Sequence, residues 1–279
     1  MIPSATWAVS GEVLDITAGG LVGILNVTPD SFSDGGDFLD PRSAVRHGVE
    51  MTAAGAMIVD VGGESTRPGA TPVAEEEELR RILPVVEGLV AEGVKVSIDT
   101  YKPAVATAAL ASGACVVNDV TGFRDPAMIE AVAASDCGVV AMHMPGTPVD
   151  MHVDPSYDDV VAEVEGALLS AAGRLEASGV ASERIVIDPG IGFGKRAHHS
   201  MALLAGIDRL SGHGYPVMVG VSRKGFLART TGDSTEVGRD QATAVLNALA
   251  YAGGARLFRV HDVPRSQAAL YLAAAIVAP

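Results

Sequence analysis

Eight short apolar segments recur along the chain, and a polar stretch follows each one. Most are rich in Val and Ile and too short to form helices, which favours strands buried on both faces. In the first, an apolar run that starts at Leu21 gives way at Asn26 to a polar loop that contains Pro29 and two adjacent glycines. The eight segments cover residues 21–27, 57–61, 94–98, 115–120, 138–142, 184–187, 216–221 and 256–260.

Segments with helical patterning alternate with these strands. Several begin at a proline and several end at a glycine, which is the usual asymmetry of helix ends. Asp40 is the predicted N-cap of the first helix, and the glutamates at 75–78 are expected to lie in solvent at the start of the second. The predicted helices cover residues 41–54, 74–92, 103–112, 126–135, 158–178, 199–211, 238–252 and 265–277.

This alternation predicts an α/β fold, a (β/α)8 TIM barrel, built from right-handed βαβ units. An open doubly wound sheet is the alternative, but no GxGxxG loop follows the first strand. Residues 1–20 hold two short apolar pieces around a Ser10–Gly11 turn, so we expect a β-hairpin that plugs one end of the barrel. Since no linker divides the chain, we predict a single domain over residues 1–279.

Composition narrows the class of protein. Hydrophobic residues make up 48% of the chain, and the formal net charge is −14, which argues against nucleic acid or an anionic membrane as the main partner. We find no run of 18 charge-free apolar residues and no basic start followed by an apolar stretch, so we expect a soluble, cytoplasmic protein. Cys115 and Cys137 have apolar neighbours and are expected to be buried, reduced thiols.

Ionisable and amide residues gather where the predicted strands end, which is where a barrel places its active site. Asp99, Asn118 and Asp188 follow three of the strands, and together they can accept hydrogen bonds from a flat heterocycle. A second group is cationic and suits a phosphate or diphosphate. It comprises Arg67, Lys224, Arg259 and His261.

Other polar residues have simpler interpretations. Asp60, Asp119 and Asp262 suit the role of caps for the elements that follow them. His143 is expected to be a structural histidine, and the adjacent His198 and His199 are expected to form a solvated face rather than a metal site. The glycine-rich loop at 190–195 lacks the spacing of a phosphate-binding P-loop. The residues alone therefore predict a barrel enzyme that binds a planar heterocycle beside an anion, without naming the reaction.

Eight motifs in order make the sequence resemble dihydropteroate synthase, the folate-pathway enzyme family. They are GILNVTPDSFSDGG at 23–36, DVGGESTRPG at 60–69, SIDT at 97–100, NDVTG at 118–122, MHMPGTP at 142–148, DPGIGFGK at 188–195, GVSRK at 220–224 and RVHD at 259–262. Pro145 stands where many relatives carry Gln. The resemblance implies that the protein joins 6-hydroxymethyl-7,8-dihydropterin diphosphate to 4-aminobenzoate and releases diphosphate in an SN1-like displacement.

The resemblance also assigns residues to the first substrate. The pterin ring would be held by Asp99, Asn118, Asp188 and Lys224, with Met142 packed on it and Arg259 stacked over it. The diphosphate would contact Asn26, Arg67, Arg259 and His261, and Asn26 matches the position associated with Mg²⁺. The catalytic set implied by the family is Asp99, Lys224, Arg259 and His261, with Asp99 the candidate that stabilises the cation on the pterin methylene.

The remaining implications concern the second substrate and the partners. The 4-aminobenzoate side would comprise Thr66, Arg67, Pro68, Ser222, Phe32 and Phe193, and loops 28–37 and 63–72 would close over it. The resemblance further implies inhibition by sulfonamides and a homodimer, for which the apolar helix over residues 268–277 is a candidate contact. Two alternatives remain: a methyltransferase that moves a methyl group from methyltetrahydrofolate to a corrinoid protein, and a non-catalytic pterin-binding homologue.

Overall fold

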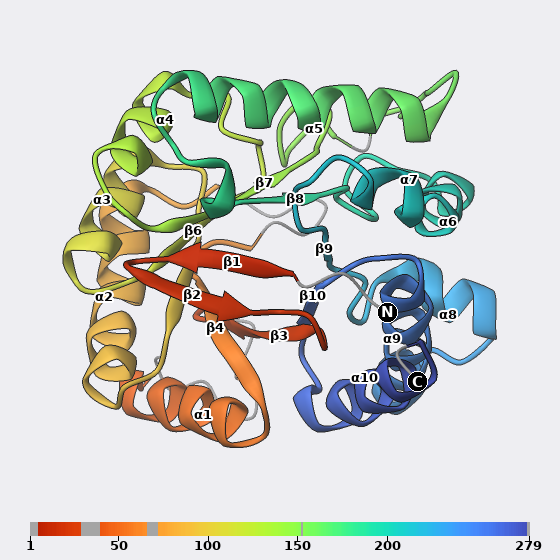
Figure 1. The fold of residues 1–279 in the computed structure, drawn as a ribbon. Helices are drawn as coiled ribbons and strands as arrows, with labels where there is room; N and C mark the ends of the chain where they lie inside the picture. The colour runs from red at the N-terminus through yellow and green to blue at the C-terminus, as the bar shows by residue number, and fades with distance from the viewer. Residues whose placement is uncertain (1–4, 29–39, 66–71, 152, 278–279) are drawn as a thin grey trace.

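Eight parallel strands form a nearly closed barrel in the computed structural model, which describes residues 5–28, 40–65, 72–151 and 153–277 (Figure 1). The strands pair in the order β8-β7-β6-β5-β4-β3-β10-β9, and a parallel bridge between Ile187 and Val217 brings the two ends of the sheet together. Each predicted apolar segment overlaps one strand, so the barrel prediction is confirmed. The strands are β3 (Gly20–Asn26), β4 (Ala56–Gly62), β5 (Val96–Asp99), β6 (Val116–Asp119), β7 (Gly138–Met142), β8 (Ile185–Asp188), β9 (Met218–Val219) and β10 (Leu257–Val260).

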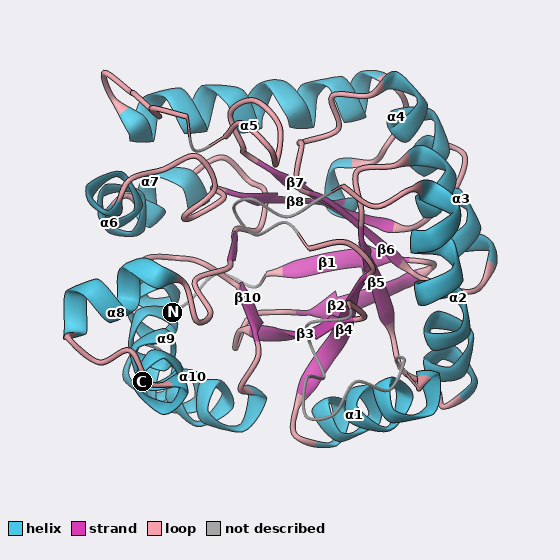
Figure 2. Cartoon of the chain, turned by 180° about the vertical axis from the view of Figure 1, so that it is seen from behind, coloured by secondary structure: helices cyan, strands magenta, loops and turns pink. Residues whose placement is uncertain are grey.

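Helices surround the barrel on all sides (Figures 1 and 2). Asp40 accepts a hydrogen bond from the Arg42 amide at 3.1 Å and caps α1 as predicted. The predicted helix over 199–211 is divided at Gly206, and the short helix α8 was not predicted. The helices are α1 (Pro41–Ala53), α2 (Glu75–Ala91), α3 (Pro103–Ala111), α4 (Pro126–Ala133), α5 (Val160–Ala177), α6 (Ala197–Ala205), α7 (Ile207–Ser211), α8 (Gly225–Thr231), α9 (Glu236–Ala252) and α10 (Val263–Val277), with a 3-10 turn at Ser182–Arg184. None of the described helices is long and apolar enough to cross a membrane.

The N-terminal hairpin lies across the end of the barrel where the strands begin (Figure 1). Its strands β1 (Thr6–Val9) and β2 (Glu12–Asp15) are antiparallel, and Ser10 and Gly11 both have positive φ, as a tight two-residue turn requires. Trp7 is fully buried and packs in a cluster with inward-facing strand residues, including Val116 and Val186. Its Nε1 donates to the Arg184 carbonyl at 2.9 Å. The hairpin therefore plugs the barrel, as predicted.

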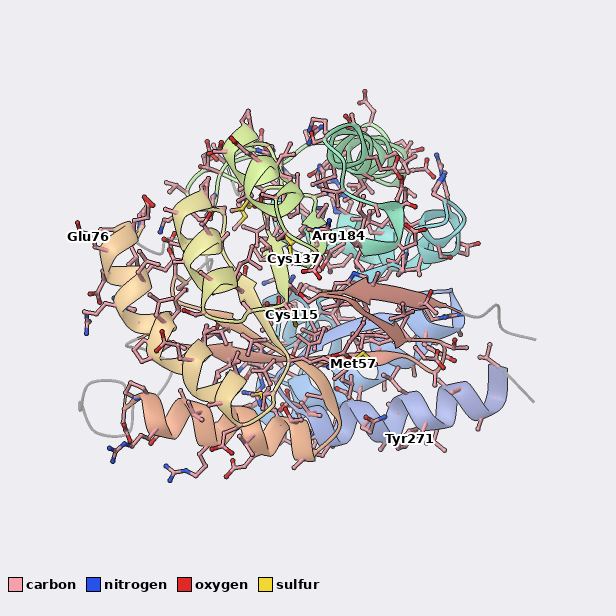
Figure 3. All side chains as sticks on the ribbon, turned by 60° about the vertical axis from the view of Figure 1, so that its left-hand side comes forward. Met57, Glu76, Cys115, Cys137, Arg184 and Tyr271 are labelled. Carbon is pink, nitrogen blue, oxygen red and sulfur yellow. The ribbon has the colours of Figure 1, made fainter. Side chains whose placement is uncertain are left out.

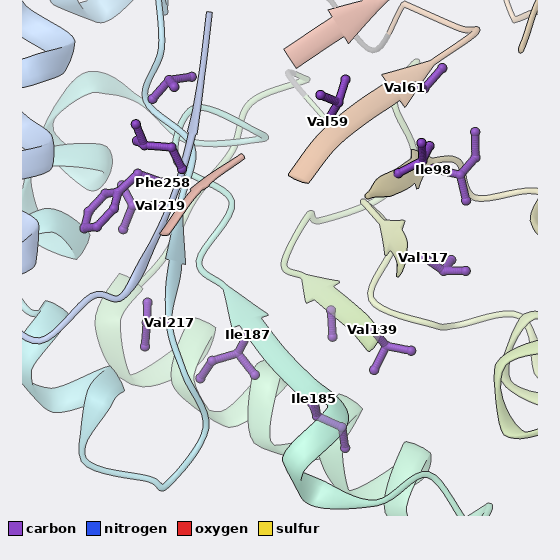
Figure 4. Close-up of a cluster of buried hydrophobic side chains, with 14 of the residues drawn as sticks. Val59, Val61, Ile98, Val117, Val139, Ile185, Ile187, Val217, Val219 and Phe258 are labelled. Carbon is purple, nitrogen blue, oxygen red and sulfur yellow. The ribbon is translucent and has the colours of Figure 1, made fainter. Parts of the chain in front are cut away.

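Side chains along each strand alternate between the two faces of the barrel wall. The outward residues, which include Val59, Val61 and Val139, pack against the helices (Figure 4). The inward residues Ile58 and Val116 instead join the cluster beneath the hairpin. Because successive side chains alternate, the residue two positions further along each strand also faces inward, nearer the carboxyl end. This period places the polar residues at the strand ends inside the barrel mouth.

The two cysteines lie where β6 and β7 begin, away from that mouth (Figure 3). Both are free thiols, with Cys137 buried and Cys115 half-buried. Burial raises the pKa of Cys115 to about 11, so its thiol stays protonated at neutral pH. The expectation of a buried thiol is confirmed for Cys137, whereas Cys115 is only half-buried.

Candidate active site at the carboxyl end of the barrel

Five polar residues form a ring inside the carboxyl end of the barrel. Each lies two positions beyond an inward-facing residue of its own strand, so the strand period alone explains why they converge. Strand pairing places Asp99 opposite Asn118, and Met142 opposite Asp188. The ring consists of Asp60, Asp99, Asn118, Asp188 and Arg259.

The Arg259 guanidinium bridges two aspartates across this mouth. Its Nε donates to Asp60 Oδ2 at 2.6 Å, and its Nη2 donates to Asp99 Oδ2 at 2.7 Å. Although burial opposes the charge, Asp60 and Asp99 raise the pKa of Arg259 above its ordinary value. The guanidinium is therefore a permanent cation whose charge is compensated within the protein.

Asp60 is not the helix cap that its position suggested. It is fully buried, and its Oδ2 accepts from Asn118 Nδ2 at 3.1 Å as well as from Arg259. Since the Asn118 amide nitrogen is used in this way, its Oδ1 is left as an acceptor. The sequence held a usable signal, because Asp60 follows the inward-facing Ile58 by two residues in an otherwise apolar strand.

Burial raises the pKa of the Asp99 carboxyl group into the neutral pH range. Desolvation raises its pKa to about 7, with Arg259 opposing this and the neighbouring carboxylates Asp60 and Glu78 adding to it. Its Oδ1 and that of Asp60 are buried and have no hydrogen-bond partner among the residues that the structure describes. Buried, unmatched acceptors are costly, and a ligand that donates to them would recover that free energy.

Lys224 lies on the opposite side of the mouth, beside Asp188 and Phe193. Its Nζ lies 4.4 Å from the centre of the Phe193 ring and donates to the Ile191 carbonyl. Burial lowers the pKa of Lys224 to about 7, and burial raises the pKa of Asp188 even though Lys224 opposes that shift. Gly192 has φ +83°, and a β-carbon there would lie only 3.0 Å from the Lys224 side chain. The glycine therefore lets this loop close over the lysine.

Ser222 orients the imidazole of His261. The Ser222 hydroxyl oxygen accepts from the His261 backbone N–H at 3.0 Å and lies 2.8 Å from His261 Nδ1. Since that backbone nitrogen can only donate, the hydroxyl is free to donate its proton to Nδ1. A neutral imidazole carries one N–H proton, which is then on Nε2, so Nε2 becomes a donor.

Arg223, between Ser222 and Lys224, has a structural role. Its φ of 57° lies in the left-handed region, which is strained for a residue with a side chain. A two-point ion pair with Asp240, at 2.7 and 2.9 Å, holds the residue there, and Glu236 lies 2.5 Å from its Nη1. The turn therefore directs Arg223 to α9 while its two neighbours serve the mouth.

The rest of the predicted site is only partly within the described chain. Asn26 ends β3 next to β4, and a β-carbon at Gly62 would lie 3.7 Å from both Asn26 Oδ1 and Asp99 Cβ, so these two residues are close neighbours. Met142 ends β7 and packs with Phe193. Phe32, Thr66, Arg67 and Pro68 lie outside the described residues, as does most of loops 28–37 and 63–72.

Several simpler interpretations can also be checked. His143 is structural, because Lys195 Nζ lies 2.9 Å from its Nδ1, and burial lowers its pKa to about 3. Asp262 accepts from the Arg265 amide at 2.9 Å and caps α10 as predicted. Asp119 caps a turn rather than a helix, since it accepts from the amides of Thr121 and Phe123.

Two predictions of solvent exposure were wrong at one residue each, whereas His198, Glu75 and Glu76 are exposed as predicted. His199 is buried, with its ring edge-on to Tyr157, because the short helix α6 turns this face inward. Glu78 is also buried, and its carboxylate pairs with Lys102 instead of facing solvent. In both cases a neighbour that is distant in the sequence covers a helix end.

Comparison with known proteins finds similarity over most of the chain. The pterin binding enzyme family matches residues 22–261. Dihydropteroate synthase of Mycobacterium leprae is 49% identical over 257 residues, covering 90% of both chains, and that of Escherichia coli is 43% identical over 93% of this chain and 92% of its own. These relatives favour a synthase over a corrinoid methyltransferase.

Solved structures of dihydropteroate synthases also superpose on this chain. Xanthomonas albilineans dihydropteroate synthase with 4-aminobenzoic acid superposes with a TM-score of 0.92 at 44% identity, covering 99% of each chain. The same enzyme in complex with 7,8-dihydropteroate has a TM-score of 0.87 at 42% identity, covering 96% of this chain and 97% of its own. The chain therefore belongs to the pterin-binding enzyme family and, within it, to the dihydropteroate synthases.

Proposed function

We propose that the protein condenses 6-hydroxymethyl-7,8-dihydropterin diphosphate with 4-aminobenzoate, and so forms 7,8-dihydropteroate and diphosphate. The observation that carries the proposal is the set of buried acceptors in the barrel mouth, Asp99, Asn118 and Asp188, with Lys224 and Arg259 beside them. A pterin offers an amino group and ring N–H donors on one edge and a carbonyl oxygen next to them. The barrel mouth offers acceptors in return, and Lys224 offers one donor. The polar groups of the protein therefore match those of the pterin in kind.

The pterin contacts follow from which atoms are available. Asp99, Asn118 Oδ1 and Asp188 accept from the amino and ring N–H groups, and Lys224 donates to the carbonyl oxygen. Met142 packs against the ring, and Arg259 stacks over it. Since both Oδ1 atoms of Asp60 and Asp99 are buried without a partner among the described residues, ligand donors would meet acceptors that the fold leaves unmatched.

The diphosphate lies towards Asn26, Arg259 and His261, together with Arg67. The Ser222 hydroxyl orients the His261 imidazole so that Nε2–H can donate to a phosphate oxygen. Asn26 Oδ1 suits Mg²⁺, which prefers oxygen ligands and binds through few protein groups together with substrate phosphates. When bound, the ion would neutralise charge that develops on the departing diphosphate.

The reaction proceeds by departure of the diphosphate before attack by the amine. The bond between the pterin methylene carbon and the diphosphate oxygen breaks, and both electrons leave with the oxygen. The positive charge on the methylene spreads into the pterin ring, where the Asp99 carboxylate stabilises it. The amine nitrogen of 4-aminobenzoate then forms a bond to the methylene carbon and loses a proton to solvent. Because the cation forms before this attack, no protein nucleophile is needed.

The 4-aminobenzoate side comprises Ser222 and Phe193 among the described residues, together with Phe32, Thr66, Arg67 and Pro68. Phe193 covers Lys224, and Ser222 contacts His261, so this side adjoins both the pterin and the diphosphate positions. A sulfonamide resembles 4-aminobenzoate in shape and charge, and we expect it to compete there.

We also propose a homodimer that pairs through α9 and α10. These two helices pack side by side (Figure 1) and carry large apolar side chains in solvent. An exposed apolar group of this kind marks an interaction surface. The residues are Val245, Leu249, Tyr271, Leu272 and Ile276, which are 59% to 77% exposed, and Tyr271 projects from α10 in Figure 3.

The test of the function is direct. The protein is mixed with dihydropterin diphosphate, 4-aminobenzoate and Mg²⁺, and both diphosphate and dihydropteroate are measured. We expect one mole of each product per mole of aminobenzoate consumed, loss of the rate when a chelator removes Mg²⁺, and competition by a sulfonamide against aminobenzoate. Absence of both products would reject the proposal.

A further inference from the structure

A buried ionic cluster lies beside the candidate active site, between the segments that follow β4 and β5. Lys102 Nζ donates to Glu64 Oε2 and Glu78 Oε2, both at 2.5 Å. The Tyr101 hydroxyl donates to Glu64 Oε1 at 2.7 Å. The side chains of Glu64, Glu78 and Lys102 are only 6%, 1% and 16% exposed. Two carboxylates thus share one ammonium group, away from bulk water.

The cluster holds both described flanks of segment 66–71. On one side Glu64 is itself a member, and the carbonyl of its neighbour Gly63 accepts from Arg81 on α2 at 3.0 Å. On the other side the Val73 amide donates to Glu64 Oε2 at 3.1 Å, and the Val73 carbonyl accepts from Lys102 at 2.7 Å. Glu64, which precedes the segment, and Lys102 therefore both bind the backbone of Val73, which follows it.

Because Glu64, Glu78 and Lys102 are charged and buried, the cluster is sensitive to substitution of any one of them. Although burial opposes this shift, the hydrogen bonds that Lys102 donates to Glu64 and Glu78 raise its pKa, so the lysine stays charged. Removing Lys102 would leave two buried carboxylates without a counter-charge, which costs far more free energy than the loss of a surface pair. Glu78 Oε1 is buried and has no partner in the described part of the chain, so the cluster has no spare donor to compensate.

We propose that Glu64, Glu78, Tyr101 and Lys102 form a positioning cluster that sets the separation of the two flanks of segment 66–71 and thereby the affinity for 4-aminobenzoate. The second part rests on the proposed function, in which Thr66, Arg67 and Pro68 belong to the aminobenzoate side. None of the four residues is assigned a contact with substrate, so the cluster acts through the backbone it binds. A merely structural cluster would change stability without separating the two substrates.

The first variant is Glu64→Gln, which keeps the shape of the side chain and leaves Lys102 paired with Glu78 alone. We expect KM for 4-aminobenzoate to rise about five- to tenfold, which corresponds to ~1–1.4 kcal/mol, with KM for the pterin substrate and kcat changed less than about twofold. Lys102→Met should raise the same KM further, and Lys102→Arg, which keeps the charge, should restore most of it. Glu165→Gln is the matched control, because Glu165 is also ion-paired, to Arg209 and His213, on the distant helix α5.

A second readout does not depend on activity. Hydrogen–deuterium exchange of the Val73 amide should be at least about tenfold faster in Glu64→Gln than in the wild type, because that amide donates to Glu64. Unchanged exchange at Val73, or an aminobenzoate KM within about twofold of wild type in both Glu64→Gln and Lys102→Met, would overturn the proposal. If the wild type itself makes no dihydropteroate, the proposed function and the link to aminobenzoate both fail, and the exchange rate alone decides whether the cluster positions the chain.

Discussion

Lys224 and Asp99 lie in one barrel mouth, and burial displaces their pKa values in opposite directions. The pKa of Lys224 is lowered to about 7 and that of Asp99 is raised to about 7, because desolvation disfavours the charged form of each. Both residues can therefore change protonation state near neutral pH. A ligand that accepts from Lys224 favours its charged form, so binding and protonation are linked.

This linkage predicts the pH dependence of the reaction. Lys224 must be protonated to donate to the pterin carbonyl, and Asp99 must be ionised to stabilise the cation. A plot of kcat/KM for the pterin substrate against pH should therefore be bell-shaped near pH 7, with its alkaline decrease due to Lys224. In Lys224→Arg the side chain remains charged, so the decrease should move to higher pH even though the absolute value is lower. Lys95→Arg, at a surface pair with Glu12, is the control. An unchanged alkaline decrease in Lys224→Arg would assign it to another group.

Asp60 also contributes to the site through the two side chains that it holds. It accepts from both Arg259 and Asn118, so Asp60→Asn removes the charge that compensates Arg259 and one acceptor that orients Asn118. We expect kcat/KM for the pterin substrate to fall at least about tenfold, at ~1.4 kcal/mol per factor of ten. Steady-state kinetics test this against Asp125→Asn, which keeps the cap of α4. Kinetics equal to the control would show that Asp60 is dispensable.

At the scale of elements, the hairpin and the strand ends have separate tasks. Trp7 fills the amino end of the barrel, and the polar ring lies at the carboxyl end, with the inward-facing apolar layer between them. The chain can therefore lose stability at one end without changing chemistry at the other. This division follows the usual separation of stability and activity between the two faces of a barrel.

Replacement of Trp7 by Ala tests that separation. The substitution leaves a cavity among Val116, Val186 and their neighbours, and removes the hydrogen bond to Arg184. We expect the free energy of unfolding to decrease by ~3–5 kcal/mol, with KM and kcat at 25 °C within about twofold of wild type. Denaturant unfolding and steady-state assays measure the two effects, with Trp7→Phe as an intermediate case. A kinetic defect with normal stability would mean that the hairpin reaches the active site.

At the scale of the whole molecule, α9 and α10 leave several large apolar side chains exposed. If these side chains form the interface of the proposed homodimer, Leu249→Glu and Leu272→Glu should each place a charge in the interface and produce monomers. Light scattering coupled to size-exclusion chromatography measures the mass. Val13→Glu, on the hairpin and 70% exposed, is the control and should keep the wild-type mass. A monomeric wild type would reject the homodimer.

Much of the architecture could be predicted because it depends on local patterns. Short Val- and Ile-rich segments form strands wherever they are buried, and Pro and Gly mark the helix ends, so all eight strands were located. The misplaced boundaries have local causes too: Gly206 interrupts a helix, and α8 is too short for its period to be evident. The predicted ligand-holding residues Asp99, Asn118 and Asp188 converge because strand period and barrel closure bring equivalent positions together.

The sequence by itself determined the eight repeated units, the hairpin and the residue types at each strand end, since these follow from neighbours in the chain. Only the tertiary structure decided the partners. Asp60 meets Asn118 and Arg259 across 58 and 199 residues, Ser222 meets His261 across 39, and Lys102 meets Glu64 across 38. The same carboxylate can cap a helix, hold an arginine or anchor a loop. Which of these it does depends on burial and on the charges that folding brings within hydrogen-bond distance.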